Sequence, residues 1–165
     1  MQVHSLLIAR RSFVMSAAAA TLLPAWASTA AKAEPPLVEV WKSPTCGCCG
    51  EWIKHLQANG FATKVNDTGN TGMRGRLGIP KEMGSCHTAL VGGYAIEGHV
   101  PAVDIQRLLA ERPQAVGLAV PGMPVGSPGM DGPVYGDRRD RYQVMLVRKD
   151  GRHGVRMPAP EPGDG

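Results

Sequence analysis

Three of the chain's four cysteines lie within four consecutive positions, at Cys46, Cys48 and Cys49, and the fourth is Cys86. In an oxidising compartment an even number of cysteines usually forms structural disulfides. The spacing argues against that arrangement, because the adjacent Cys48 and Cys49 cannot pair without strain and a Cys46–Cys49 bridge closes too small a loop to stabilise much. The cluster therefore favours a fold that uses its thiols for redox or metal chemistry, with a disulfide-stapled domain as the alternative.

The residues around the cluster predict a strand, a turn and a helix. Residues 37–41 form a β-rich run that ends at the turn around Pro44. A helix is predicted from Cys48 to Asn59, because Trp52, Ile53 and Leu56 recur at helical spacing and Asn59-Gly60 supplies a helix stop. The cysteines are thus expected at the start of a helix that follows a strand, which is the edge of a sheet where functional sites collect.

The remainder of the chain predicts further strands and helices in an order typical of α/β proteins. We expect a strand at 61–65, a helical turn at 73–77, a hairpin at 87–91 and 94–97, a helix at 101–109, and a closing C-terminal hairpin at 142–147 and 153–157. This order predicts a thioredoxin-like α/β fold, with a central mixed sheet and helices on both faces. Residues 117–130 are too rich in glycine, proline and methionine for regular structure, and we expect an ordered or lid-like loop there.

The first 33 residues resemble an export signal peptide rather than a part of the fold. Arg10 and Arg11 precede an apolar stretch, and Ala31-Lys32-Ala33 resembles a cleavage site. The paired arginines favour the twin-arginine route, with ordinary secretion as the alternative. Pro24 leaves the apolar stretch shorter than the about 20 residues of a spanning helix, so no stable membrane anchor is expected. We expect a periplasmic protein, cleaved after about Ala33, with one domain at 34–157 and a disordered tail at 158–165.

The charge balance argues against nucleic acid as a partner. The full chain carries 18 Lys and Arg against 14 Asp and Glu, a formal net charge of +4. Three of the basic residues lie in the expected export signal, which leaves 15 basic against 14 acidic side chains in the rest. Since no basic stripe or patch survives, we expect neither nucleic acid nor an anionic membrane surface as a ligand.

The cysteine pattern itself indicates a soft metal. Cys46 and Cys49 form a CxxC at a helix start, where unpaired amides and the helix dipole lower thiol pKa values. Cys48 would scramble disulfide exchange, whereas for a metal it is one more soft donor. In a thioredoxin topology Cys86 falls in the loop that faces the CxxC, where thioredoxins carry a cis-proline. A fourth thiolate there predicts Cu(I), as one ion or as several bridged ions, with zinc as the alternative.

Five histidines and methionines are weaker candidates for metal ligation: Met83, His87, His99, Met123 and Met130. Met83 also fits ordinary loop packing, His87 also fits a capping or core-edge histidine, and His99 also fits a surface histidine before a helix. Met123 and Met130 both follow Pro-Gly in the irregular stretch, which favours a lid over the metal. His55 is expected on a solvated helix face.

Four motifs in a fixed order resemble the exported CxCC family of predicted metal-binding proteins, which includes the CopG-type copper-resistance proteins. They are KSPTCGCC at 42–49, SCHT at 85–88, EGHVP at 97–101 and GLAVPGMPVGSPGM at 117–130. The resemblance covers about residues 37–147 and is more specific than a lone CxxC. It implies a thioredoxin-like fold, a periplasmic setting, and copper that the cysteines bind or handle in redox chemistry.

These observations leave three functions open. The first is Cu(I) binding by the four cysteines in copper resistance or homeostasis, with periplasmic copper-handling or redox proteins as partners. The second is an enzyme, a thiol-disulfide or copper oxidoreductase that cycles Cys46 and Cys49. The third is a zinc-binding or disulfide-stapled exported domain.

Overall fold

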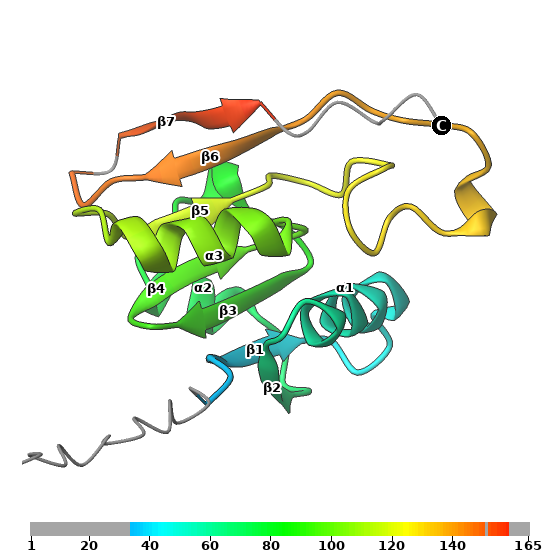
Figure 1. Ribbon diagram of the computed structural model, residues 1–165, viewed down its shortest axis with the longest axis horizontal. Coiled ribbons are helices and arrows are strands. Elements are labelled where there is room, and N and C mark those ends of the chain that lie inside the picture. Colours follow the sequence, from blue (N-terminus) through cyan, green and yellow to red (C-terminus); the bar gives the residue numbers. More distant parts are fainter. Residues whose placement is uncertain (1–33, 151, 159–165) are drawn as a thin grey trace, which may run out of the picture. The chain divides into compact units, whose positions relative to one another are not determined.

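The computed structural model describes residues 34–150 and 152–158 (Figure 1). The expected export signal at 1–33 and residues 159–165 of the expected tail lie outside the described residues. Pro158, which was expected to begin the tail, ends the last strand instead. The described elements are β1 (Leu37–Lys42), α1 (Gly47–Ala58), β2 (Ala62–Asn66), α2 (Thr71–Arg76), η1 (Lys81–Met83), β3 (His87–Val91), β4 (Tyr94–Glu97), α3 (Ala102–Glu111), β5 (Gly117–Ala119), η2 (Pro133–Tyr135), β6 (Gln143–Val147) and β7 (His153–Pro158).

The described strands form one mixed sheet with the order β2-β1-β3-β4-β5-β6-β7. β1 runs parallel to β2 and β4 runs parallel to β5, whereas the other neighbours are antiparallel. The β3–β4 hairpin turns at Gly92 and Gly93, which both have positive φ angles, 55° and 86°. Such a two-residue turn matches the twist of the flanking strands and requires residues that tolerate positive φ. The mixed α/β sheet predicted from the sequence is confirmed.

α1 and α3 pack together on one face of the sheet. Trp52 and Leu56 of α1 and Ile105 and Leu108 of α3 are fully buried in one apolar cluster, to which the sheet contributes residues such as Ile96. Full burial of a side chain of this size stabilises the fold by about 1.5–3 kcal/mol. The helical spacing seen in the sequence therefore marks the face of α1 that fixes the cysteine turn to the sheet.

A second, smaller apolar cluster covers the opposite face. Ala95 and Ala119 belong to it, together with Ile79 and Met83 from the segment before β3. Successive side chains of a strand point to opposite faces of a sheet. Ala95 therefore belongs to the second cluster, whereas the adjacent Ile96 belongs to the first. Figure 1 shows α3 in front of the sheet and α2 behind it, so helices lie on both faces as expected.

The prediction that residues 117–130 are wholly irregular is wrong at the start of the stretch. Gly117–Ala119 forms β5, which pairs with both β4 and β6. A Cβ on Gly117 would lie 1.7 Å from the carbonyl oxygen of Ala95, so the glycine permits the close approach of β5 to β4. Three residues within a Gly- and Pro-rich run carry too short a pattern to predict a strand, and the pairing on both sides supplies what the local sequence lacks.

Within the described residues, no helix has the length and apolar character that crossing a membrane requires.

Candidate metal centre

The sheet brings Cys86 to the cysteine turn. Cys46 is the N-cap of α1, and Cys48 and Cys49 lie in its first turn. Lys42, the last residue of β1, pairs with His87, the first residue of β3, so the chain that leaves β1 and the chain that enters β3 meet at the same edge. The expectation that the loop before the third strand faces the CxCC is met by the structure.

The four sulfur atoms converge within one small volume. The Sγ atom of Cys48 lies 3.6 Å from that of Cys46 and 3.8 Å from that of Cys86. All four sulfurs lie within 4.8 Å of one another, a separation at which a single metal ion or a small bridged cluster can reach every donor. Cys49 is fully buried and the other three cysteines are half-buried.

Cys46 and Cys49 are joined by a disulfide, while Cys48 and Cys86 are free thiols. The Cα atoms of Cys46 and Cys49 are 5.4 Å apart, which is inside the ordinary range for a disulfide. In this state the cluster offers two thiols. Reduction of the bridge by two electrons and two protons converts the cluster into a four-thiol site.

The Cys86 thiol is protonated at neutral pH. Burial, together with the neighbouring Cys48, raises its pKa to about 12. Because metals bind the thiolate, a soft ion must displace this proton when it binds. The bound state is therefore favoured by rising pH.

His99 presents a ring nitrogen to Cys86. Its Nε2 atom lies 3.1 Å from the sulfur of Cys86, and its Nδ1 atom lies 2.9 Å from the carbonyl oxygen of Pro128. A carbonyl only accepts, so Nδ1 carries the proton and the lone pair of Nε2 faces the sulfur. Burial lowers the pKa of His99, which keeps the ring neutral. A neutral imidazole whose second nitrogen donates to a carbonyl has the arrangement that metal-ligating histidines use.

His87 is fully buried beside the same sulfur. Its Nδ1 atom lies 3.4 Å from the sulfur of Cys86. The centroid of its ring lies 4.2 Å from that of Trp52, at an angle of 35° between the rings, and 5.0 Å from that of His99, whose ring is nearly perpendicular. Its Nε2 atom is buried without a hydrogen-bond partner. Burial is the main cause that lowers its pKa to about 3. The structure thus places His87 in the core. One ring nitrogen of His87, one of His99 and the sulfur of Cys86 form a second group of possible ligand atoms within 4.8 Å of one another.

The glycine- and proline-rich loop packs directly on the cysteine turn. A Cβ on Gly129 would lie 2.7 Å from both the carbonyl oxygen of Cys48 and the amide nitrogen of Trp52. Gly129 also has a positive φ of 85°, so two separate constraints favour glycine there. The carbonyl of the preceding Pro128 holds His99. The loop expected to cover the site therefore contacts both the cysteine helix and a candidate ligand.

The three methionine candidates occupy different environments. Met130 is buried, and its sulfur accepts a hydrogen bond from the hydroxyl of Tyr135. Met123 is 54% exposed. Met83 packs in the second core cluster, on the sheet face opposite α1, in agreement with the loop-packing alternative. Ligation of a metal by any of these thioethers stays a prediction.

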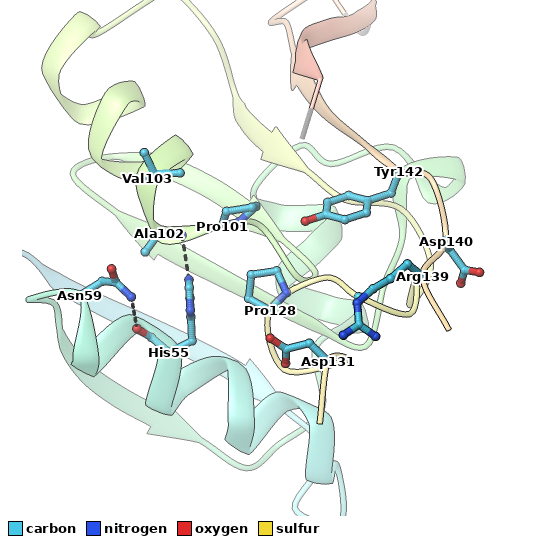
Figure 2. Close-up of a pocket in the computed structure, with 11 residues that line it drawn as sticks. His55, Asn59, Pro101, Ala102, Val103, Pro128, Asp131, Arg139, Asp140 and Tyr142 are labelled. Carbon is cyan, nitrogen blue, oxygen red and sulfur yellow. Dashed lines mark hydrogen bonds between the residues drawn. The ribbon is translucent and has the colours of Figure 1, made fainter. Parts of the chain in front are cut away.

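The sequence suggested that His55 lies on a solvated helix face, and the structure shows that this prediction is wrong. It is half-buried, and its Nε2 atom accepts a hydrogen bond from the backbone amide of Ala102 at the start of α3. It lines a cavity of about 310 Å³ between α1, α3 and the 126–142 loop, together with Pro128, Asp131 and Tyr142 (Figure 2). The contact joins two helices far apart in the sequence, which no local pattern could reveal.

The chain resembles a solved copper-resistance protein over most of its length. Two structures titled copper resistance protein CopG, form 2 and form 1, each match it with 48% sequence identity and a TM-score of 0.70. Each match covers 77% of this chain, with 100% of the form 2 chain and 99% of the form 1 chain. A family described as a protein of unknown function, DUF411, matches residues 83–130. No curated protein matches the chain.

Proposed function

The chain belongs to the same family as copper resistance protein CopG, and on this basis we propose that it is an exported periplasmic protein that binds Cu(I) through its four cysteines. Its role is copper resistance or homeostasis, and its partners are copper ions and periplasmic copper-handling or redox proteins. The observation that carries the proposal is the convergence of Cys46, Cys48, Cys49 and Cys86 within 4.8 Å.

The donor set favours Cu(I) over zinc. Thiolates and neutral imidazoles are donors that Cu(I) accepts in low coordination, whereas structural zinc requires four ligands at the corners of a tetrahedron. Three of the four thiols lie on one turn at the start of α1, which suits sulfur-bridged ions better than a single tetrahedral ion. The lone pair of His99 beside Cys86 supplies a further donor. We infer a site for more than one Cu(I) ion, with zinc as the competing metal.

The arrangement of the first four strands supports a thioredoxin-like domain. Their order, β2-β1-β3-β4, combines a parallel β1–β2 pair joined through α1 with the antiparallel β3 and β4. The CxxC lies at the junction of β1 and α1, and Cys86 takes the place that thioredoxins give to a cis-proline. The Ser85–Cys86 region thereby becomes a ligand-bearing loop instead of a peptide-binding one.

A redox role is the second candidate, and the Cys46–Cys49 disulfide favours it. Two Cu(II) ions can oxidise the reduced pair, which yields two Cu(I) ions, one disulfide and two protons. In the reverse direction, two electrons and two protons from a reducing partner restore the dithiol. Because the disulfide removes two of the four donors, the same step couples the oxidation state of the thiols to the capacity for copper.

Metal counting separates the two candidates. The purified, fully reduced protein is titrated anaerobically with Cu(I) against a competing chelator, and copper per chain is measured for the wild type and for each cysteine-to-serine variant. Binding predicts tight copper in the wild type and a loss in all four variants, including Cys48→Ser. Ser43→Ala, beside the cluster but without a thiol, is the matched control and should keep full capacity.

Two outcomes contradict the proposal. Absence of tight Cu(I) in the reduced wild type removes the binding function. Full copper capacity in Cys48→Ser would show that the middle thiol is not a ligand and would favour a redox CxxC alone.

A further inference from the structure

A buried ion pair lies on the face of the sheet opposite α1, beside Ser85, the residue that precedes Cys86. Glu97, the last residue of β4, is fully buried, and its Oε1 atom accepts a hydrogen bond of 2.8 Å from Nε of Arg74 on α2. Burying two charges costs free energy that their attraction repays only in part, and well-packed apolar residues often stabilise a core equally well. The pair therefore calls for an explanation other than stability.

The carboxylate of Glu97 is surrounded by donors. It accepts hydrogen bonds from the backbone amide of Ser85 at 2.7 Å and from the hydroxyl of Thr88 at 2.5 Å, in addition to the bond from Arg74. The hydroxyl oxygen of Thr88 in turn accepts from the side-chain amide of Asn70 at 3.2 Å, which orients the hydroxyl proton towards Glu97. Burial raises the pKa of Glu97, whereas the three groups that donate to its carboxylate favour the ionised form.

The same network holds the peptide bond that leads into Cys86. The carbonyl oxygen of Ser85 accepts hydrogen bonds from Nη2 of Arg74 at 2.5 Å and from the side chain of Asn70 at 3.2 Å. The hydroxyl of Ser85 donates to the carbonyl oxygen of Gly122. Every polar atom of Ser85 is thus hydrogen-bonded. The carbonyl group of Ser85 lies in the same peptide plane as the Cα atom of Cys86.

The backbone is closely packed around this network at Gly98. Gly98 follows Glu97 with a positive φ of 72°, and a Cβ there would lie 2.5 Å from both the hydroxyl oxygen of Ser85 and the carbonyl oxygen of Val120. A side chain at position 98 would therefore displace Ser85 or the Val120 carbonyl. A rotation of the Ser85–Cys86 peptide would break the bonds to Arg74 and Asn70 together.

We propose that Arg74 and Glu97 are positioning residues that clamp Ser85, so that the thiol of Cys86 points at the CxCC turn. The inference rests on the proposed function, since it assigns this ion pair to the geometry of the fourth cysteine. Neither side chain belongs to the four-cysteine cluster. The clamp acts through the two ends of Ser85, with Glu97 on the amide and Arg74 on the carbonyl.

The expected size of the effect follows from other metal sites. Loss of a group that orients a ligand lowers metal affinity by about 10- to 100-fold. Glu97→Gln keeps the shape of the side chain but replaces one acceptor oxygen by an NH₂ group, which faces Arg74 or Thr88 as a second donor. Thr88→Val removes one donor to Glu97 with little change of shape on a strand, so it weakens the clamp with the least risk to folding.

Two measurements test the clamp, and the first requires no copper. In the protein with the Cys46–Cys49 disulfide, Cys48 and Cys86 are the free thiols, and a reagent with two electrophilic arms that fluoresces on bridging two thiols reports their mutual orientation. We expect bridging to slow about tenfold in Glu97→Gln and to a smaller extent in Thr88→Val, while single alkylation of Cys48 keeps its rate. Glu39→Gln and Thr63→Val, which change hydrogen-bonded side chains on β1 and β2, are the matched controls.

The second measurement is Cu(I) affinity of the reduced protein against a chelator. The clamp predicts a 10- to 100-fold weaker affinity in Glu97→Gln and wild-type affinity in both controls. Wild-type bridging rates in folded Glu97→Gln and Thr88→Val overturn the clamp, even if the wild type binds copper tightly. If the wild type binds no copper, the proposed function fails, and the bridging rates alone decide whether the clamp exists. Should Glu97→Gln not fold, Thr88→Val against Thr63→Val gives the decision.

Discussion

His87 makes the metal-free protein sensitive to acid. Its pKa is lowered from 6.5 to about 3, mainly by burial. In the folded protein the ring stays neutral, whereas in the unfolded chain it takes up a proton below pH 6.5. The unfolded state thus binds more protons between pH 6.5 and 3, and the stability that depends on a neutral His87 is complete above pH 6.5 and is lost as the pH falls.

The magnitude follows from the pKa difference. Each unit corresponds to about 1.4 kcal/mol, so His87 alone should lower the free energy of unfolding by roughly 2 kcal/mol between pH 6.5 and pH 5. The full effect approaches roughly 5 kcal/mol at pH 3. Losses of this size are a large share of the stability of an ordinary domain.

His87→Leu isolates this contribution. The leucine cannot be protonated, fills an apolar position against Trp52 and removes the Nε2 atom that has no partner. We expect the free energy of unfolding to change little at pH 7, because the lost packing is offset by the removal of an unsatisfied buried polar atom. At pH 5 the variant should have lost roughly 2 kcal/mol less than the wild type.

Urea unfolding of the metal-free protein at a series of pH values checks this prediction. His153→Gln, which removes an exposed histidine of β7, is the control and should follow the wild-type pH dependence. If His87→Leu and the wild type lose stability in parallel between pH 7 and pH 5, the buried neutral state of His87 is refuted.

Three further predictions follow from the same structure. In the protein with the Cys46–Cys49 disulfide, iodoacetamide should modify Cys86 at least about 100-fold more slowly than free cysteine at pH 8, because the pKa of Cys86 is raised to about 12. The rate should still rise above pH 9, and a plateau near pH 9 in a pH-rate profile would contradict this. Gly129→Ala should lower the free energy of unfolding by about 1–3 kcal/mol and weaken Cu(I) binding, because a Cβ at positive φ meets the Cys48 carbonyl. A melting curve and a Cu(I) affinity equal to those of the wild type would show that the loop does not pack on the cysteine turn. Gly117→Ala should prevent stable folding, because a Cβ 1.7 Å from the Ala95 carbonyl separates β5 from β4, and a native circular dichroism spectrum with a cooperative melt would refute that pairing.

The sequence predicted most elements that carry a strong local pattern. The apolar spacing from Trp52 to Leu56 places α1 within one residue of the observed Gly47–Ala58, and Gly92-Gly93 marks the β3–β4 hairpin at its observed bounds. β5 was missed because its pairing partners, and not its own residues, make it a strand.

The candidate centre was predictable where topology alone sets it. The strand–cysteine–helix order and a cysteine before the third strand suffice to bring Cys86 to the CxCC turn, and the structure shows this contact. The roles of Arg74 and Glu97 could not be predicted, since a charged pair on a short helix and a strand looks like ordinary surface charge until burial and the bonds to Ser85 are known. For the same reason, the tautomer of His99 depends on the Pro128 carbonyl from a distant loop.

X-ray absorption at the copper edge is the most direct test of a Cu(I) site built from cysteine sulfurs. The reduced protein is loaded anaerobically with Cu(I), freed of unbound copper, and examined with its copper content measured on the same sample. Binding by the four cysteines predicts monovalent copper with a coordination shell dominated by sulfur, and a loss of sulfur scattering in Cys86→Ser. A shell of nitrogen and oxygen alone, or a spectrum unchanged in Cys86→Ser, would contradict a copper site built from the four cysteines.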